Sequence, residues 1–359
     1  MREEFLTYKL KNMSLNDKIG QMLMIDYRDV PHMTVELERI LTNYNPGGFI
    51  LFKSNIRTFN QTRQFLNDIK NATNIRPMVS VDQEGGRVQR LDERVGFQKY
   101  PPASEIGKTM DINVAFELGA KIGAELRAIG VDMNMAPVLD IFSNPQNKVV
   151  ADRAFGTNIE IVKAMALAYA EGLKKENVIA VGKHFPGHGD TIKDSHIDLP
   201  IIEKDLDALR QLELIPFIEA VKQKLPGLMI AHIAVPKVTN DVTPASLSKI
   251  MICDLLRNDM GYTGLIMPDS LKMKALTNYF NNEDIYLRCI EAGNDFILMP
   301  QNIKEAYEII YRKVSEGIIS EERIEQSVYR ILETKFDYGF FAHEYQEFLK
   351  YNKPYVKRK

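Results

Sequence analysis

The sequence predicts an α/β protein built as a single (β/α)8 barrel of the TIM type, and two observations carry this prediction. Short apolar runs alternate with longer segments of helical periodicity, and the alternation occurs eight times. The runs are apolar on consecutive residues, which is typical of strands buried on both faces in a parallel sheet covered by helices. The 359 residues fit one such barrel with insertions, which usually has ~200 to over 400 residues.

The expected strands follow one another at intervals long enough for a helix. They are Met22–Asp26, Gly48–Phe52, Met78–Asp82, Met133–Leu139, Val178–His184, Gly227–His232, Leu265–Asp269 and Phe296–Met299. A doubly wound open sheet is the alternative architecture. Neither G-x-G-x-x-G nor G-x-x-x-x-G-K-[ST] follows the early strands, which favours the barrel.

Helical periodicity fills the intervals and continues after the last strand. The expected helices are Thr34–Thr42, Thr58–Ala72, Val114–Ile129, Ile161–Lys175, Lys204–Gln223, Ser246–Asp259, Glu283–Ala292, Ile303–Gly317 and Glu321–Lys335. The last of these would close the barrel. We therefore expect one catalytic barrel domain over residues 1–340, a basic C-terminal tail over 341–359 and no C-terminal sandwich domain.

The composition of the chain argues against several classes of protein. The chain has 46 basic and 48 acidic side chains, so no nucleic-acid partner is indicated. Its two cysteines exclude a disulfide scaffold. No apolar run approaches the roughly 18 residues of a membrane span, and the N-terminus lacks a secretory signal. We expect a cytoplasmic protein with a small-molecule substrate.

Polar residues follow five neighbouring strands, at the end of the barrel where active sites lie. The third strand leads into Asp82, Glu84 and Arg90; the fourth into Asp140 and Arg153; the fifth into Lys183 and His184; the sixth into His232; and the seventh into Asp269. A salt-bridged surface loop is the alternative for residues 82–90, and a structural role is the alternative for His232. Asp269 ends a buried strand, where a carboxylate is costly unless it is paired or used.

The densest group of polar residues is Lys183–His196, which holds three of the six histidines. Pro186 and Gly187 exclude a regular helix or a central strand, so these side chains are expected on an irregular loop. A solvated loop that is polar by chance is the alternative. His184 and His188 are four residues apart, but the same Pro186 breaks the helix that a zinc-binding H-E-x-x-H site needs. A zinc amidohydrolase-like barrel is the metal alternative; we expect neither a metal nor a cofactor.

These residues together resemble glycoside hydrolase family 3, and within it the bacterial β-N-acetylglucosaminidases (β-hexosaminidases). The matching stretches span nearly the whole chain in order, and the run from Lys183 is highly specific to that subgroup. They are Ser14–Leu23, Val81–Leu91, Asn134–Asp140, Asp152–Gly156, Lys183–His196 with Leu199-Pro200, Ala231-His232 and Met267–Leu271.

The resemblance implies a hydrolase of the TIM-barrel type that removes terminal β-linked N-acetylglucosamine with retention of configuration. It implies Asp269 as the nucleophile, with Asp194 and His196 as the acid/base dyad. The residues that match positions holding the sugar are Asp82, Arg90, Arg153, Lys183 and His184. The implied substrates are fragments of peptidoglycan (muropeptides) or chitooligosaccharides. Pro268 departs from the family, which usually has Ser or Thr before the nucleophile.

The chemistry agrees with these roles. Retaining hydrolysis needs a carboxylate that attacks the anomeric carbon and a proton donor for the leaving oxygen. Histidine titrates near ~6.5 without help, so His196 suits the second task, and Asp194 two residues earlier could orient its ring. Two other functions remain open: a β-N-acetylglucosaminide phosphorylase, which forms sugar 1-phosphate, and a catalytically silent muropeptide-binding protein.

Overall fold

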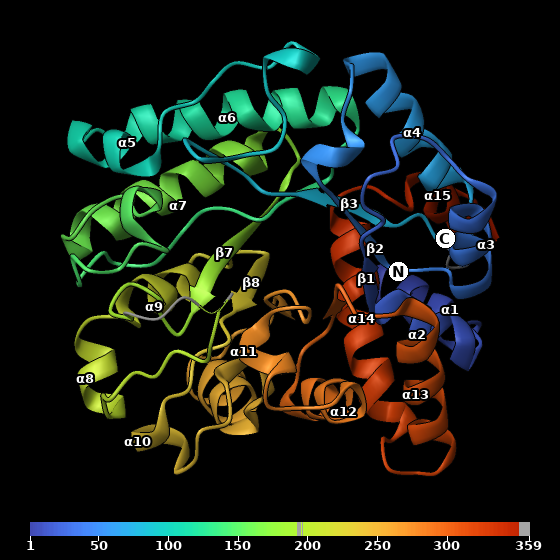
Figure 1. Ribbon diagram of the computed structural model, residues 1–359. Helices are drawn as coiled ribbons and strands as arrows, with labels where there is room; N and C mark the ends of the chain where they lie inside the picture. Colours follow the sequence, from blue (N-terminus) through green and yellow to red (C-terminus); the bar gives the residue numbers. More distant parts are fainter. Residues whose placement is uncertain (192–194, 196, 352–359) are drawn as a thin grey trace, which may run out of the picture.

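The computed structural model describes residues 1–191, 195 and 197–351, and it confirms a single barrel of eight parallel strands surrounded by helices (Figure 1). Every expected strand is present, although most are shorter than predicted. In barrel order the strands are β10 (Ile297–Leu298), β1 (Leu23–Ile25), β2 (Gly48–Leu51), β3 (Met78–Val81), β6 (Met133–Asn134), β7 (Ile179–Phe185), β8 (Gly227–Ile230) and β9 (Leu265–Pro268).

The barrel is nearly closed, and its register is continuous from β10 to β9. Leu23 lies opposite Ile297 at one end of the series, and Ile230 lies opposite Pro268 at the other. Two backbone hydrogen bonds join the β9 and β10 regions. Asp295 N donates to Ile266 O over 2.7 Å, and Leu271 N donates to Leu298 O over 3.1 Å. All eight strands therefore present their carboxyl ends on the same face.

Helices of eight residues or more cover the outside of the barrel (Figure 1). They are α1 (Arg2–Lys11), α2 (Leu15–Met22), α3 (Val35–Tyr44), α4 (Phe59–Asn71), α6 (Ile112–Ile129), α7 (Ile159–Lys175), α9 (Ile215–Lys222), the π-helix Ile250–Asp259, α12 (Asn282–Ala292), α13 (Ile303–Ser315), α14 (Glu321–Asp337) and α15 (Ala342–Tyr351). None of the described helices is long and apolar enough to cross a membrane.

Helices α6 and α7 cross with their backbones in close contact, which two glycines allow. A Cβ atom on Gly119 would lie 2.1 Å from the carbonyl oxygen of Tyr169, and one on Gly172 would lie 2.2 Å from that of Phe116. The sequence shows these glycines inside helical segments, where glycine is otherwise unfavourable. The close packing of α6 against α7 therefore explains these two glycines.

Two expected elements differ from the structure. The fourth strand ends at Asn134 because Pro137 has no N–H to donate, although Ala136 O still accepts from Val181 N over 2.9 Å. The segment 204–223 forms two helices, α8 (Leu206–Gln211) and α9. The break falls at Leu212, and Pro216 lies in the first turn of α9, where its missing N–H costs little.

Within the segment 341–359, predicted as a basic C-terminal tail, residues 342–351 form helix α15. Phe348 and Tyr345 contact the ring of Phe5 on α1, with centroid distances of 5.4 and 5.3 Å. These aromatic side chains gain stability by leaving water. Residues 352–359 lie outside the described part.

Candidate active site

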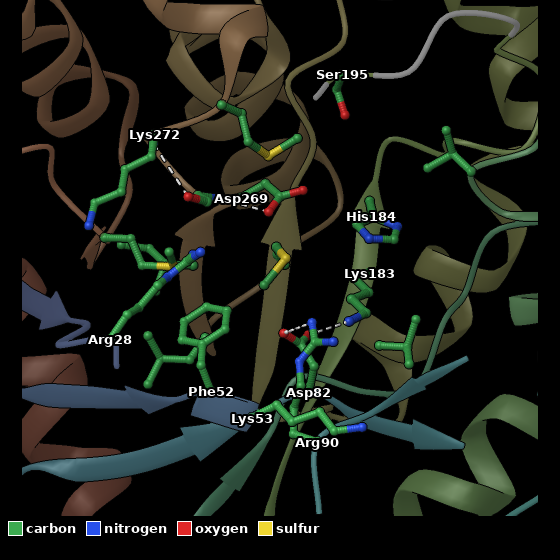
Figure 2. Close-up of a pocket in the computed structure, with 18 of the residues that line it drawn as sticks. Arg28, Phe52, Lys53, Asp82, Arg90, Lys183, His184, Ser195, Asp269 and Lys272 are labelled. Carbon is green, nitrogen blue, oxygen red and sulfur yellow. Dashed lines mark hydrogen bonds and ion pairs between the residues drawn. The ribbon is translucent and has the colours of Figure 1, made fainter. Parts of the chain in front are cut away.

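A cavity of about 850 Å3 lies at the carboxyl ends of the strands, where the sequence predicts the site. Figure 2 shows its labelled side chains converging from several strand ends. The predicted residues that line it are Asp82, Arg90, Arg153, Lys183, His184 and Asp269. The structure therefore brings together every predicted site residue that it describes.

Asp269 follows the last residue of β9 and lies beside the open cavity. Its backbone N–H donates to Ile230 O over 2.8 Å, which continues the pairing between β8 and β9 past Pro268. Pro268 therefore leaves the strand end in register. The Asp269 Oδ1 atom accepts a hydrogen bond from Ser270 N at 2.7 Å. No described residue donates a hydrogen bond to Oδ2, so this oxygen is available to a ligand.

Nearby charges keep the Asp269 carboxylate ionised. Burial by itself raises the pKa of Asp269, but the charges of His184 and His232 and the Ser270 N–H lower it by more, so the pKa lies below its ordinary value. A carboxylate that stays deprotonated beside a cavity can act as a nucleophile or stabilise a cation.

Two carboxylates and three cations form a largely buried network at one end of the cavity. Lys183 Nζ lies 2.9 Å from Asp82 Oδ1 and 2.5 Å from Glu84 Oε1. Arg153 holds Glu84 in a bidentate pair, with bonds of 2.9 Å from Nε and 2.8 Å from NH2. Arg90 closes the network on the cavity side, 3.3 Å from Asp82 Oδ2. Such fork geometry fixes both partners in position.

The network lowers the pKa values of its acids. Burial raises the pKa of Glu84, but the adjacent Arg153 and Lys183 outweigh burial and hold it well below its ordinary value. The pKa of Asp82 is also lowered, because Lys183 and Arg90 outweigh its burial. Both carboxylates are therefore hydrogen-bond acceptors at neutral pH. Arg153 donates hydrogen bonds to Glu84 from Nε and Nη2, and it donates one to Val149 O from Nη1 over 3.2 Å. Its main contacts are therefore with the network.

The buried carboxylate of Asp140 positions the two histidines at the end of β7. Asp140 Oδ2 lies 2.7 Å from His184 Nδ1, and Asp140 Oδ1 accepts from the backbone N–H groups of His184 at 3.1 Å and His188 at 2.7 Å. This arrangement orients His184 so that its Nε2 edge faces Arg153 at 3.4 Å. Asp140 was recognised in the sequence only as the polar end of a strand.

His188 lies next to His184, with the two ring centroids 5.7 Å apart, and is neutral. Burial, followed by the charge of His184, lowers the pKa of His188 to about 4. Its Nδ1 atom lies 2.7 Å from Thr191 Oγ1, and its Nε2 atom lies 3.4 Å from Ser195 Oγ. Ser195 O also accepts from Ala275 N at 3.1 Å. Asp194 and His196, the predicted dyad, lie outside the described residues.

His232 occupies a structural position beside Asp269. Its Nδ1 atom lies 2.7 Å from Ser246 Oγ, and its Nε2 atom lies 2.9 Å from Ser270 O. Both ring nitrogens therefore contact protein groups, and the ring fixes the backbone that follows Asp269. Among the described residues, no three His, Cys, Asp or Glu side chains are placed to hold a metal ion.

Several residues that were not predicted also line the cavity. Arg28 follows β1, Phe52 and Lys53 follow β2, and Lys272 and Lys274 follow β9. The basic residues carry the same sequence signal as the predicted ones, a polar group just after a strand. This signal is weak after the first two strands, because no dense run of polar residues follows them.

We expect Glu84→Gln to destabilise the fold, because it removes the negative charge that two buried cations share. Breaking a buried ion pair typically costs ~3–5 kcal/mol. The lowered pKa of Glu84 means that its contribution is present above the unfolded pKa of ~4.3 and is lost as the pH falls toward the folded value. Urea unfolding should therefore show a gap between wild type and variant at pH 7 that narrows below pH ~4.

The matched control is Glu105→Gln, since Glu105 is an exposed glutamate on α5 (Ala103–Thr109) outside the network. A Glu84→Gln protein as stable as this control at pH 7 would contradict the role of the network. An unchanged gap from pH 7 to pH 3 would contradict the assignment of its charge.

Comparison with known proteins agrees with this geometry. Residues 14–334 match the family described as the glycosyl hydrolase family 3 N terminal domain. The beta-hexosaminidase A of Pseudoalteromonas piscicida is 30% identical over 90% of this chain, which spans 61% of that protein.

Two solved structures are also similar. A glycoside hydrolase family 3 beta-N-acetylglucosaminidase from Paenibacillus has a TM-score of 0.89 and 35% identity, with 91% of this chain and 63% of that chain covered. LpqI of Mycobacterium tuberculosis has a TM-score of 0.84 and 30% identity, with coverage of 92% and 96%. The chain thus spans less than two thirds of two of these three relatives and nearly all of the third.

Proposed function

Because the chain belongs to glycosyl hydrolase family 3, we propose that it is a retaining, exo-acting β-N-acetylglucosaminidase that releases terminal β-linked N-acetylglucosamine. The observation that carries the proposal is Asp269, an ionised carboxylate with one oxygen free of described protein donors beside a cavity of about 850 Å3. The names of the relatives, beta-hexosaminidase and beta-N-acetylglucosaminidase, support the choice of sugar.

The proposed reaction has two steps. The Asp269 carboxylate attacks the anomeric carbon, the bond to the leaving oxygen breaks, and a proton passes to that oxygen. Water then attacks the glycosyl-Asp269 ester and gives up a proton, which restores the carboxylate. Each step passes through an oxocarbenium-like transition state, whose positive charge the ionised Asp269 stabilises.

The buried network supplies the contacts for the sugar. Each carboxylate oxygen of Asp82 has a second lone-pair site, so Asp82 can accept from sugar hydroxyls while it remains paired with Lys183 and Arg90. Arg90 and the His184 Nε2 edge add groups that can bond hydroxyl or acetamido oxygens. Because these groups are held before substrate arrives, little ordering is needed on binding.

The proton donor is proposed from the sequence. His196 would give the proton to the leaving oxygen and later accept one from water, and Asp194 would orient its ring. Asp82, Glu84 and Asp269 are poor proton donors, because the pKa of each is lowered. The proposed proton donor is therefore a group other than these three carboxylates.

Small fragments of peptidoglycan or chitin are the proposed natural substrates, since each carries terminal β-linked N-acetylglucosamine. The substrate is a sugar, and the proposed reaction consumes only water. No step requires a cofactor.

The assay is hydrolysis of 4-nitrophenyl N-acetyl-β-glucosaminide, with the products separated in phosphate buffer and in a phosphate-free buffer. We expect free N-acetylglucosamine in both, released first as the β-anomer. N-acetylglucosamine 1-phosphate, formed only with phosphate, would identify a phosphorylase instead. Binding of N-acetylglucosamine without turnover of any β-glycoside would identify a silent binding protein.

A further inference from the structure

The strongest feature that the proposed function does not use is a cationic end of the cavity, opposite the buried network. It consists of Arg28, Phe52, Lys272 and Lys274, which we call the basic end. Figure 2 shows Arg28 and Lys272 on the far side of Phe52 from Asp82, with Asp269 between the two ends. A ligand that spans the cavity therefore passes Asp269 on its way from one end to the other.

The charges of the two ends differ. Together with Asp269, the buried network holds three cations and three carboxylates, so a neutral sugar suits it. At the basic end one carboxylate is shared by two cations: Asp26 lies 2.6 Å from Lys272 Nζ and 3.1 Å from Arg28 Nε.

Lys274 adds a charge without a described partner. It is exposed on the cavity rim, and no carboxylate of the described residues lies within ion-pair distance of its Nζ atom. Counting Asp29, which also lines the cavity, three cations face two carboxylates at the basic end, an excess of one positive charge. The cations are Arg28, Lys272 and Lys274, and the carboxylates are Asp26 and Asp29.

Arg28 is also oriented for a ligand. Its guanidinium lies over the Phe52 ring, 4.0 Å from the centroid, and its bond to Asp26 uses Nε alone. Its two terminal nitrogens, Nη1 and Nη2, have no hydrogen-bond acceptor among the described residues. A guanidinium held over an aromatic ring, with no described acceptor on its terminal nitrogens, suits a carboxylate, which it can bind through two parallel bonds.

We propose that the basic end binds a carboxylate on the leaving group of the substrate, so that the protein selects anionic aglycones over neutral ones. This proposal rests on the proposed function, because it assigns the buried network to the sugar and the basic end to the group on the other side of Asp269. Arg28 receives the carboxylate, and Lys272 and Lys274 raise its local concentration. These three are specificity-determining residues.

The test uses two substrates of nearly the same size and shape, one anionic and one neutral: N-acetyl-β-glucosaminides of 3-hydroxybenzoate and of 3-hydroxybenzamide. The measured quantity is the ratio of kcat/KM for the anionic substrate to that for the neutral one. We expect a ratio above 1 in wild type. Lys274→Glu reverses a charge at an exposed rim position and should lower the ratio about three- to ten-fold, mainly through KM.

Two further variants separate an effect of the basic end from an effect of net charge. Arg28→Gln removes the fork and should lower the ratio in the same way without reversing a charge. Lys121→Glu is the control, since Lys121 is exposed on α6 outside the cavity and changes net charge equally. The wild-type preference should also weaken with added salt, because the Debye length falls from ~10 Å at 0.1 M to ~3 Å at 1 M.

The outcomes separate this proposal from the proposed function. If wild type cleaves neither glycoside, the proposed function fails and the proposal fails with it. If both are cleaved with a ratio that Lys274→Glu and Arg28→Gln leave unchanged, the proposed function stands and the basic end does not select aglycones. An equal drop in Lys121→Glu would show that the effect is one of net charge, which would also overturn the assignment.

Discussion

Replacing Asp269 with alanine is expected to abolish turnover while the fold and the binding of N-acetylglucosamine persist. The loss in kcat should be ~10³-fold or more, because no covalent intermediate can form and no other carboxylate replaces it at the end of β9. The side chain is tied to the protein by one described hydrogen bond, from Ser270 N, so its removal should disturb the fold little. Removal of a buried charge with a free oxygen can even raise the melting temperature.

Covalent labelling provides the direct measurement. A 5-fluoro-N-acetylglucosaminyl fluoride should trap the glycosyl-enzyme, and peptide mapping should place the label on Asp269. Asp254→Ala, an exposed aspartate on the π-helix 250–259, serves as the matched control and should retain full activity. A label on another residue, or an Asp269→Ala protein with substantial kcat, would disprove the nucleophile assignment.

The second large effect is expected at His196. If His196 protonates the leaving oxygen, His196→Ala should slow substrates with poor leaving groups far more than the 4-nitrophenyl glycoside, because 4-nitrophenolate departs with little protonation. A general acid typically contributes ~10² to 10⁴-fold, so the gap between the two substrate types should be of that order. The measurement is kcat for both substrates in wild type and variant.

Asp194→Asn should act in the same way but less severely, because it changes the orientation and basicity of the imidazole without removing it. The losses in the two single variants should not add in the double variant, as expected for residues that act as one unit. Equal slowing of both substrate types by His196→Ala would indicate a role in binding or folding. Glu84 and His188 are poor substitutes for the acid, because Glu84 is held ionised by Arg153 and Lys183 and the pKa of His188 is about 4.

The position of the site could be predicted because a parallel barrel places all strand ends on one face. Asp82, Lys183 and Asp269 are far apart in the sequence, yet each follows an apolar run, and that pattern alone brings them to one cavity. The structure of residues 342–351 could not be predicted in this way, because the contacts of Tyr345 and Phe348 with Phe5 join the two ends of the chain.

The alternation of strands and helices, the single barrel and the residue types at the strand ends could all be predicted from the sequence, because hydrophobic periodicity and strand order are local properties of the chain. How those residues pair became clear from the three-dimensional structure. Asp140 orients His184, Glu84 holds Lys183 with Arg153, and Arg28 lies over Phe52. These pairs join residues from different strand ends, and their pKa values depend on burial and on charges a few ångströms away, which one-dimensional spacing does not contain.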